Sequence, residues 1–156
     1  MGAGKSTVGR RLAKKLGWKF IDLDHEIERR EHRRISEIFR QDGEPHFRHL
    51  ESLCLKHLST SAKTVIALGG GTFLDSENRE LAEKTGLTVW LKVSFSNIAD
   101  RVKIDGTRPN FSDKAQAERL YQTREPFYAL AKVHIDADDA TPESAADEII
   151  GELRKL

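Results

Sequence analysis

The sequence is poor in several features, and each scarcity excludes a class of protein. Cys54 is its only cysteine, so an internal disulfide is impossible and a reducing compartment is expected. It contains no run of about 18 apolar residues, and its N-terminus carries no apolar stretch typical of a signal peptide. The 26 basic and 25 acidic residues nearly cancel, so bulk charge does not indicate nucleic acid or a membrane as a partner. We therefore expect a soluble, cytoplasmic protein, and a monomer.

What the sequence does contain is an alternation of short β-rich runs with longer helical periods. This alternation over 156 residues predicts a single domain, 1–156, with a three-layer α/β/α fold and a mainly parallel sheet. Apolar runs predict strands at 18–22, 64–68, 87–91 and 133–135. Helical spacing predicts helices up to Gly17 and at 35–40, 45–58, 76–84, 96–102, 114–131 and from Pro142 onward. Gly17 is the predicted C-cap of the first helix and Thr141 the predicted N-cap of the last. The polar residues 103–113 are expected to form a mobile loop.

The chain opens on a phosphate-binding motif, Gly2-Ala3-Gly4-Lys5-Ser6-Thr7. In the full pattern, G-x-x-x-x-G-K-[ST], glycines turn backbone N–H groups toward phosphate oxygens beside a helix N-terminus. Lys5 is expected to contact the β- and γ-phosphates, and the Ser6 hydroxyl to ligate Mg²⁺. ATP and Mg²⁺ are therefore the expected cofactors, and a P-loop kinase fold is the expected architecture.

Only the second half of this motif is in the chain. The first glycine of the pattern would fall two places before Met1, and the strand that precedes such loops is also missing. That strand lies in the middle of such sheets, so its neighbours would lose hydrogen-bond partners on both sides. We hypothesise that the natural protein starts upstream of Met1, and we expect the chain as given to be weak or inactive.

Two further motifs indicate a small acceptor molecule. Asp22 and Asp24 come at the end of a predicted strand, where alternation would place both on the same side of the backbone. One carboxylate would serve Mg²⁺ and the other an acceptor hydroxyl; solvent-facing or capping aspartates are the alternative. Gly69, Gly70 and Gly71 follow a buried strand and permit close approach of the backbone to a ligand; a structural turn is the alternative.

Three arginines lie in separate segments, each beside aromatic residues or proline: Arg48, Arg108 and Arg124. The guanidinium fork suits carboxylate and phosphate, because two parallel N–H donors match two oxygens. For any one of them considered alone, a surface salt bridge is the simpler reading.

In their order and separations, these motifs resemble the shikimate kinases over essentially the whole chain. The motifs that carry the resemblance are Gly2–Thr7, Asp22-x-Asp24, Phe47-Arg48 with Glu51, Gly69–Gly71, Arg108-Pro109 and Arg124-x-x-x-Tyr128. The resemblance implies transfer of the ATP γ-phosphate to the 3-hydroxyl of shikimate, a step of chorismate and aromatic amino-acid biosynthesis. Shikimate is a small ring with one carboxylate and three hydroxyls, which is the chemistry that the arginines and aspartates suit.

The resemblance also implies roles for the acceptor side, about residues 24–55. Asp24 would bind the ring hydroxyls and orient or deprotonate the attacking one. Arg48 and Arg124 would bind the carboxylate, and Glu51 would orient Arg48. The ring would lie against apolar side chains and glycine backbone, contributed by Phe39, Phe47 with Ile35 nearby, and Gly69, Gly70 and Gly71.

On the nucleotide side, the resemblance implies a lid at 103–113 that carries Arg108 to the transferring phosphoryl group. Lys5, Asp24 and Arg108 would be the catalytic residues. Arg101 would stack on adenine and Pro142 would lie in the adenine loop. The implied magnesium ligands are Ser6 and Asp22.

The expected lid departs from the family pattern. The lid usually reads Arg-Pro followed by two aliphatic residues, whereas here Asn110 and Phe111 follow Pro109, so its closure is expected to differ. Two other functions stay open. A gluconate-kinase-like enzyme would explain Lys5 and Ser6 but not the arginines. A catalytically impaired nucleotide-binding homologue would explain the incomplete motif.

Overall fold

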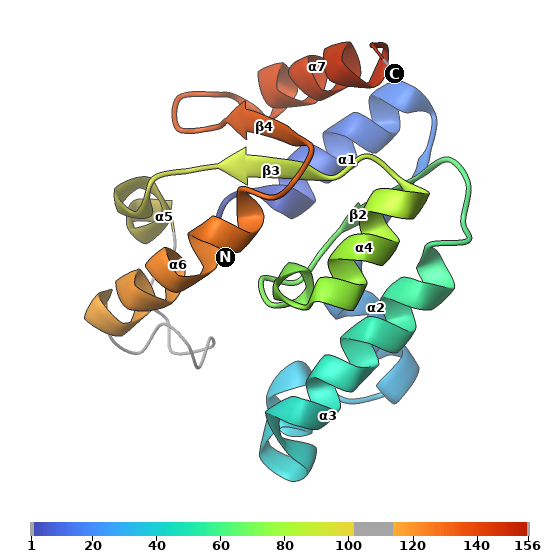
Figure 1. The fold of residues 1–156 in the computed structure, drawn as a ribbon, viewed down its shortest axis with the longest axis vertical. Coiled ribbons are helices and arrows are strands. Elements are labelled where there is room, and N and C mark those ends of the chain that lie inside the picture. The colour runs from blue at the N-terminus through green and yellow to red at the C-terminus, as the bar shows by residue number, and fades with distance from the viewer. Residues whose placement is uncertain (1, 102–113, 156) are drawn as a thin grey trace.

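The computed structural model describes residues 2–101 and 114–155. Its helices are α1 (Lys5–Leu16), α2 (Leu23–Glu31), α3 (Ile35–Leu58), α4 (Ser76–Thr85), α5 (Phe95–Arg101), α6 (Lys114–Tyr128) and α7 (Pro142–Leu153), with a 3₁₀ turn η1 (Thr72–Leu74) (Figure 1). Its strands are β1 (Lys19–Asp22), β2 (Thr64–Ala67), β3 (Val89–Lys92) and β4 (Val133–Asp136). Within the described ranges, none of the helices is both long and apolar enough to cross a membrane.

The strands form two parallel pairs. β1 pairs with β2 from Lys19↔Thr64 to Asp22↔Ala67, and β3 pairs with β4 from Val89↔Val133 to Lys92↔Asp136. Helices α1 and α7 pack together on one side of the strands, whereas α4 and α6 lie on the other (Figure 1). The predicted α/β fold with parallel strands is confirmed.

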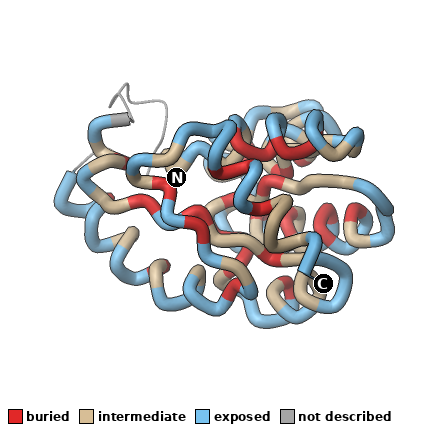
Figure 2. The backbone as a smooth tube through the Cα atoms, turned by 90° about the horizontal axis from the view of Figure 1, so that it is seen from above, coloured by how far each residue is buried: buried red, intermediate tan, exposed pale blue. Residues whose placement is uncertain are grey.

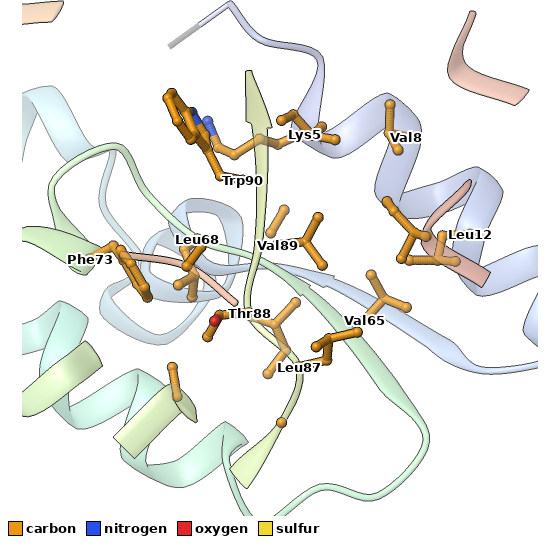
Figure 3. A pocket seen from close by; sticks show the side chains of 18 of the residues that line it. Lys5, Val8, Leu12, Val65, Leu68, Phe73, Leu87, Thr88, Val89 and Trp90 are labelled. Atoms are coloured by element: carbon orange, nitrogen blue, oxygen red, sulfur yellow. The ribbon is translucent and has the colours of Figure 1, made fainter. Parts of the chain in front are cut away.

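Between the two strand pairs lies a cavity of about 490 Å³ (Figure 3). In the described residues β2 pairs only with β1 and β3 only with β4, so the facing edges of β2 and β3 have no strand between them.

The helices begin and end at residues whose types favour capping. Gly17 adopts the left-handed conformation (φ 67°), and its N–H donates to the carbonyls of Ala13 and Lys14. The Thr141 hydroxyl accepts from the Ser144 N–H at 3.1 Å, and Pro142 occupies the first turn of α7. Both predicted caps are confirmed.

The break predicted between residues 40 and 45 is also present. The backbone leaves the helical region at Gly43 (φ 81°, ψ 170°), and Pro45 follows at the start of the second segment. Proline is tolerated there because the first turn of a helix has no partner for its N–H. The kink sets the direction of the segment that carries Phe47 and Arg48.

The helix α2 was not predicted, and the expected strand-like alternation of Asp22 and Asp24 is wrong. β1 ends at Asp22, whose side chain accepts from the N–H groups of Asp24 (3.1 Å) and His25 (3.4 Å). A carboxylate that satisfies these N–H groups starts a helix at the next residue. Leu23 and Ile27 are buried on one side of that helix.

Buried residues are spread over the inward-facing stretches of the backbone (Figure 2), and the apolar ones form two clusters that hold these elements together. The first joins α1, β3, β4 and α7 through Leu12, Leu91, Ile135, Ala146 and Ile149. The second joins α2 and α3 through Leu23, Ile27, Ile38, Phe47 and Cys54. The second cluster therefore supports the elements that carry the predicted acceptor residues.

Candidate active site

The phosphate-binding motif forms a turn that leads directly into α1. Gly2 and Gly4 both have positive φ (68° and 82°), a backbone that non-glycine residues rarely adopt. No side chain caps the helix at Gly4, so the first N–H groups of α1 suit an anion such as phosphate. The Lys5 side chain points toward Trp90 across the cavity (Figure 3). Its contact with nucleotide phosphates stays a prediction, as do those of Ala3 and the exposed Thr7.

The two predicted magnesium ligands lie together. The Ser6 hydroxyl donates to Oδ2 of Asp22 at 2.5 Å, which joins the first turn of α1 to the end of β1. A hydroxyl and a carboxylate are the oxygen ligands that Mg²⁺ prefers, with phosphate oxygens and water completing the shell. No cluster of three or more acidic, histidine or cysteine side chains occurs in the part of the chain that the structure describes. The donor set therefore fits a metal that is bound together with a nucleotide.

The glycine loop brings two acidic side chains close to its backbone. A Cβ built on Gly69 would lie 2.6 Å from Oε1 of Glu51 and 2.8 Å from Oδ1 of Asp24. Thr72 holds Glu51 in place, because its hydroxyl donates to Oε1 at 2.6 Å in a buried contact. Only glycine at residue 69 leaves room for both carboxylates.

Asp24 has the electrostatics of a general base. Burial raises its pKa, the charges of Asp22 and Glu51 raise it further, and Lys5 lowers it. A carboxylate with a raised pKa takes a proton more readily at neutral pH than an ordinary aspartate.

Arg48 reaches the same loop from α3. Its Nη1 donates to Oε2 of Glu51 at 2.6 Å, so the predicted pair lies together. Its other edge donates to Oε1 of Glu44, from Nη2 at 2.7 Å and from Nε at 3.1 Å. Glu51 is buried and Glu44 is exposed, so Glu51 fixes the guanidinium whereas Glu44 can exchange for another carboxylate.

The guanidinium of Arg48 lies against Gly71. A Cβ on Gly71 would overlap Nη1 and lie 2.5 Å from Cζ. We therefore expect Gly71→Ala to displace Arg48 and to raise the KM for an anionic acceptor about tenfold or more, since a charged hydrogen bond contributes about 1.5–3 kcal/mol. Initial rates at varied acceptor concentration check this.

Gly86→Ala is the matched control, because a Cβ there meets nothing closer than 3.8 Å. It should leave both KM values unchanged. An unchanged acceptor KM in Gly71→Ala would mean that Arg48 does not bind the acceptor from this position.

Arg124 is a buried residue of α6. It is only 8% exposed, and its Nε is a buried donor without a partner among the described residues. One helical turn later, the Tyr128 hydroxyl donates to the Gly70 carbonyl at 2.5 Å. Burial raises the pKa of Tyr128, and the positive charge of Arg124 opposes that rise. A buried guanidinium with an Nε that lacks a partner among the described residues suits an anionic ligand.

The predicted apolar wall is assembled as well. The rings of Phe39 and Phe47 have centroids 4.8 Å apart, and Ile35 packs against the same cluster. The Arg48 guanidinium lies 5.4 Å from the Phe47 ring centroid. An apolar ring face and a fixed positive charge are therefore adjacent.

Three residues of this cluster had no role from the sequence: Glu44, Thr72 and Tyr128. Glu44 lies four residues before Arg48, a spacing that favours a helical ion pair. Tyr128 lies one turn after Arg124 and so follows it on the same helix face. No sequence signal indicated Thr72.

The nucleotide-side predictions for the lid, Arg101 and Pro142 are not tested by the structure. The lid at 103–113, with Arg108, Pro109, Asn110 and Phe111, lies outside the described residues, and so does the side chain of Arg101. Pro142 is exposed at the start of α7, and its predicted place near adenine stays a prediction.

The comparisons with known proteins all indicate the same family. The family model "Shikimate kinase" matches residues 1–154. The chain is 37% identical to a shikimate kinase of Persephonella marina, over 99% of this chain and 94% of that protein. It is 41% identical to one of Xylella fastidiosa strain M12, over 98% and 87%.

Solved structures agree with the sequence relatives. A shikimate kinase from Acinetobacter baumannii in complex with shikimate matches with a TM-score of 0.93 and 34% identity, over 99% of this chain and 89% of that one. The Aquifex aeolicus enzyme matches with a TM-score of 0.89 and 33% identity, over 99% and 92%. The chain belongs to the shikimate kinase family.

Proposed function

We propose that this chain transfers the γ-phosphoryl group of ATP to the 3-hydroxyl of shikimate, giving shikimate 3-phosphate and ADP. The observation that carries the proposal is the arrangement around the glycine loop, where Asp24 lies beside Gly69 and Arg48 lies against Gly71. Arg124 adds a buried guanidinium whose Nε has no partner within the described ranges. A base beside two cations suits an acceptor that carries both a hydroxyl and a carboxylate. The related Acinetobacter baumannii structure, which holds shikimate, supports this choice.

The chemistry requires positioning and one proton transfer. Arg48 and Arg124 bind the acceptor carboxylate, and this turns a ring hydroxyl toward Asp24. Asp24 accepts the hydroxyl proton as the oxygen bonds to the γ-phosphorus and the bond from phosphorus to the ADP oxygen breaks. The N-terminus of α1 and Lys5 hold the phosphates in line. Arg108 of the predicted lid completes the charge around the transferring group.

The paired oxygens of Ser6 and Asp22 are the residues that would hold Mg²⁺. When bound there with ATP, the ion neutralises charge on the β- and γ-phosphates. Asp22 also caps α2, so the same carboxylate fixes the helix that carries Asp24.

The test is a coupled assay of ADP formation in the presence of ATP and Mg²⁺, with shikimate or gluconate as the acceptor. Shikimate is expected to stimulate turnover and gluconate is not. Stimulation by gluconate alone would indicate a different small-molecule kinase. Binding of ATP with no turnover on either acceptor would indicate an impaired nucleotide-binding homologue.

A further inference from the structure

We propose that Thr72 is a positioning residue for the acceptor, because its hydroxyl fixes the Glu51 carboxylate and Glu51 in turn fixes Arg48. The inference rests on the proposed binding of the acceptor carboxylate by Arg48, and it extends control of that binding to η1. Thr72 and Glu51 are each 1% exposed, so the hydrogen bond between them is shielded from water. A change in this buried contact therefore reaches the acceptor through Arg48.

The two oxygens of the Glu51 carboxylate have different donors. The Thr72 hydroxyl donates to Oε1 at 2.6 Å, and Nη1 of Arg48 donates to Oε2 at 2.6 Å. The last torsion of a glutamate side chain is broad, so a single contact does not set the plane of its carboxylate. A donor on each oxygen does set it, and the direction of the Arg48 guanidinium follows. Without the hydroxyl, the carboxylate can turn and take Arg48 with it.

Thr72 is itself held by the residues around it. Its N–H donates to the Gly69 carbonyl at 3.2 Å, and its own carbonyl accepts from Nδ2 of Asn78 at 3.2 Å. Asn78 is buried in the first turn of α4, where its N–H donates to Oδ1 of Asp75 at 2.9 Å. The hydroxyl that contacts Glu51 therefore projects from a fixed backbone, which a positioning group requires.

The rest of η1 is held by α4 as well. Nη1 of Arg79 donates to the carbonyls of Phe73 at 3.0 Å and Leu74 at 2.7 Å. No predicted acceptor residue lies on α4, and yet its first turn supports the segment that directly follows the glycine loop. The structure thus connects α4 to Arg48 through the Thr72 hydroxyl and Glu51.

Thr72→Val tests the connection, because valine keeps the branched shape and lacks the hydroxyl. The KM for shikimate should rise about threefold to tenfold, the range expected for one hydrogen bond. The KM for ATP and kcat should stay close to those of the unsubstituted chain, a pattern that indicates lost acceptor binding rather than lost chemistry. Thr72→Ser retains the hydroxyl and should restore the KM. Calorimetric titration with shikimate measures the same change without turnover.

Thr88→Val is the matched control for the loss of a buried hydroxyl. Thr88 is also buried, and its hydroxyl accepts from the Lys132 N–H at 3.0 Å, away from the glycine loop. This variant should lower Tm about as much as Thr72→Val does and leave the KM for shikimate unchanged. A lower Tm with an unchanged shikimate KM in Thr72→Val would overturn the proposal. So would a Thr72→Ser variant that binds shikimate no better than Thr72→Val.

Crystal structures of the ligand-free variants separate this proposal from the proposed function. The contact between Nη1 of Arg48 and Glu51 should be lost in Thr72→Val and kept in Thr72→Ser. If the unsubstituted chain binds no shikimate, the proposed function fails, and these two structures still decide whether Thr72 positions Arg48. Arg48 and Glu51 unmoved in Thr72→Val would overturn the positioning role, whichever acceptor the chain takes.

Discussion

Asp24→Asn is expected to lower kcat by about 10²- to 10⁴-fold, the contribution typical of a positioned general base. Asparagine keeps the size of the side chain but cannot accept the hydroxyl proton. The KM for ATP should stay close to that of the unsubstituted chain, because Asp24 reaches the loop at Gly69 rather than the N-terminus of α1. Initial-rate kinetics with both substrates varied give the two parameters.

The same substitution should make the protein more stable at neutral pH. Burial and the neighbouring acids raise the pKa of Asp24, so folding favours its protonated form. Ionised Asp24 therefore destabilises the folded state, and this cost appears as the pH rises from the unfolded pKa through the raised folded one. The neutral amide in Asp24→Asn removes that cost, so Tm at pH 7 should rise while kcat falls.

The pH dependence gives a second check on the base. The acidic limb of kcat/KM for the unsubstituted chain should lie above the ordinary aspartate range, because Asp24 must be ionised to accept the proton. Glu77→Gln, which changes an exposed carboxylate on α4, should alter neither kcat nor the acidic limb of kcat/KM. Full turnover in Asp24→Asn would rule out the role of Asp24 as the base.

Arg124→Ala should raise the KM for shikimate by about ten- to a hundredfold, since each charged hydrogen bond contributes about 1.5–3 kcal/mol. The KM for ATP should change much less. Arg124→Lys keeps the charge but loses the planar fork. Its KM for shikimate should therefore lie between that of the unsubstituted chain and that of Arg124→Ala. Calorimetric titration with shikimate measures the same loss without turnover.

Arg119→Ala is the matched control on the same helix, because Arg119 is exposed on α6. Stability distinguishes a binding role from a structural one. Nε of Arg124 has no partner in the described parts of the chain, but the guanidinium also interacts with Tyr128, so the Tm of Arg124→Ala measures how much Arg124 supports the fold. A large fall in Tm with an unchanged acceptor KM would show that Arg124 supports the fold instead.

The features that the sequence predicted well depend on local chemistry. Gly17 and Thr141 end and begin helices through contacts within a few residues, and such contacts follow from residue type alone. Glu51 lies one turn from Arg48, so their ion pair also follows from spacing. The roles of the acceptor residues came from the family resemblance of the ordered motifs, and they stay predictions.

The features that the sequence did not predict depend on contacts between distant segments or on competition between local structures. The sequence Asp22-Leu23-Asp24 alternates like a strand, but capping by the Asp22 carboxylate favours a helix from Leu23 onward. The hydrogen bond from Tyr128 to Gly70 joins residues 58 positions apart, and spacing carries no signal for it. Thr72 contacts Glu51 only because η1 packs on α3.

The most direct measurement is a crystal structure of the chain with shikimate bound. The account predicts the ring carboxylate within hydrogen-bond distance of both Arg48 and Arg124, with Glu44 displaced from Arg48. It also predicts one ring hydroxyl on the Asp24 carboxylate beside Gly69. Shikimate bound away from the glycine loop, or with its carboxylate on neither arginine, would contradict it.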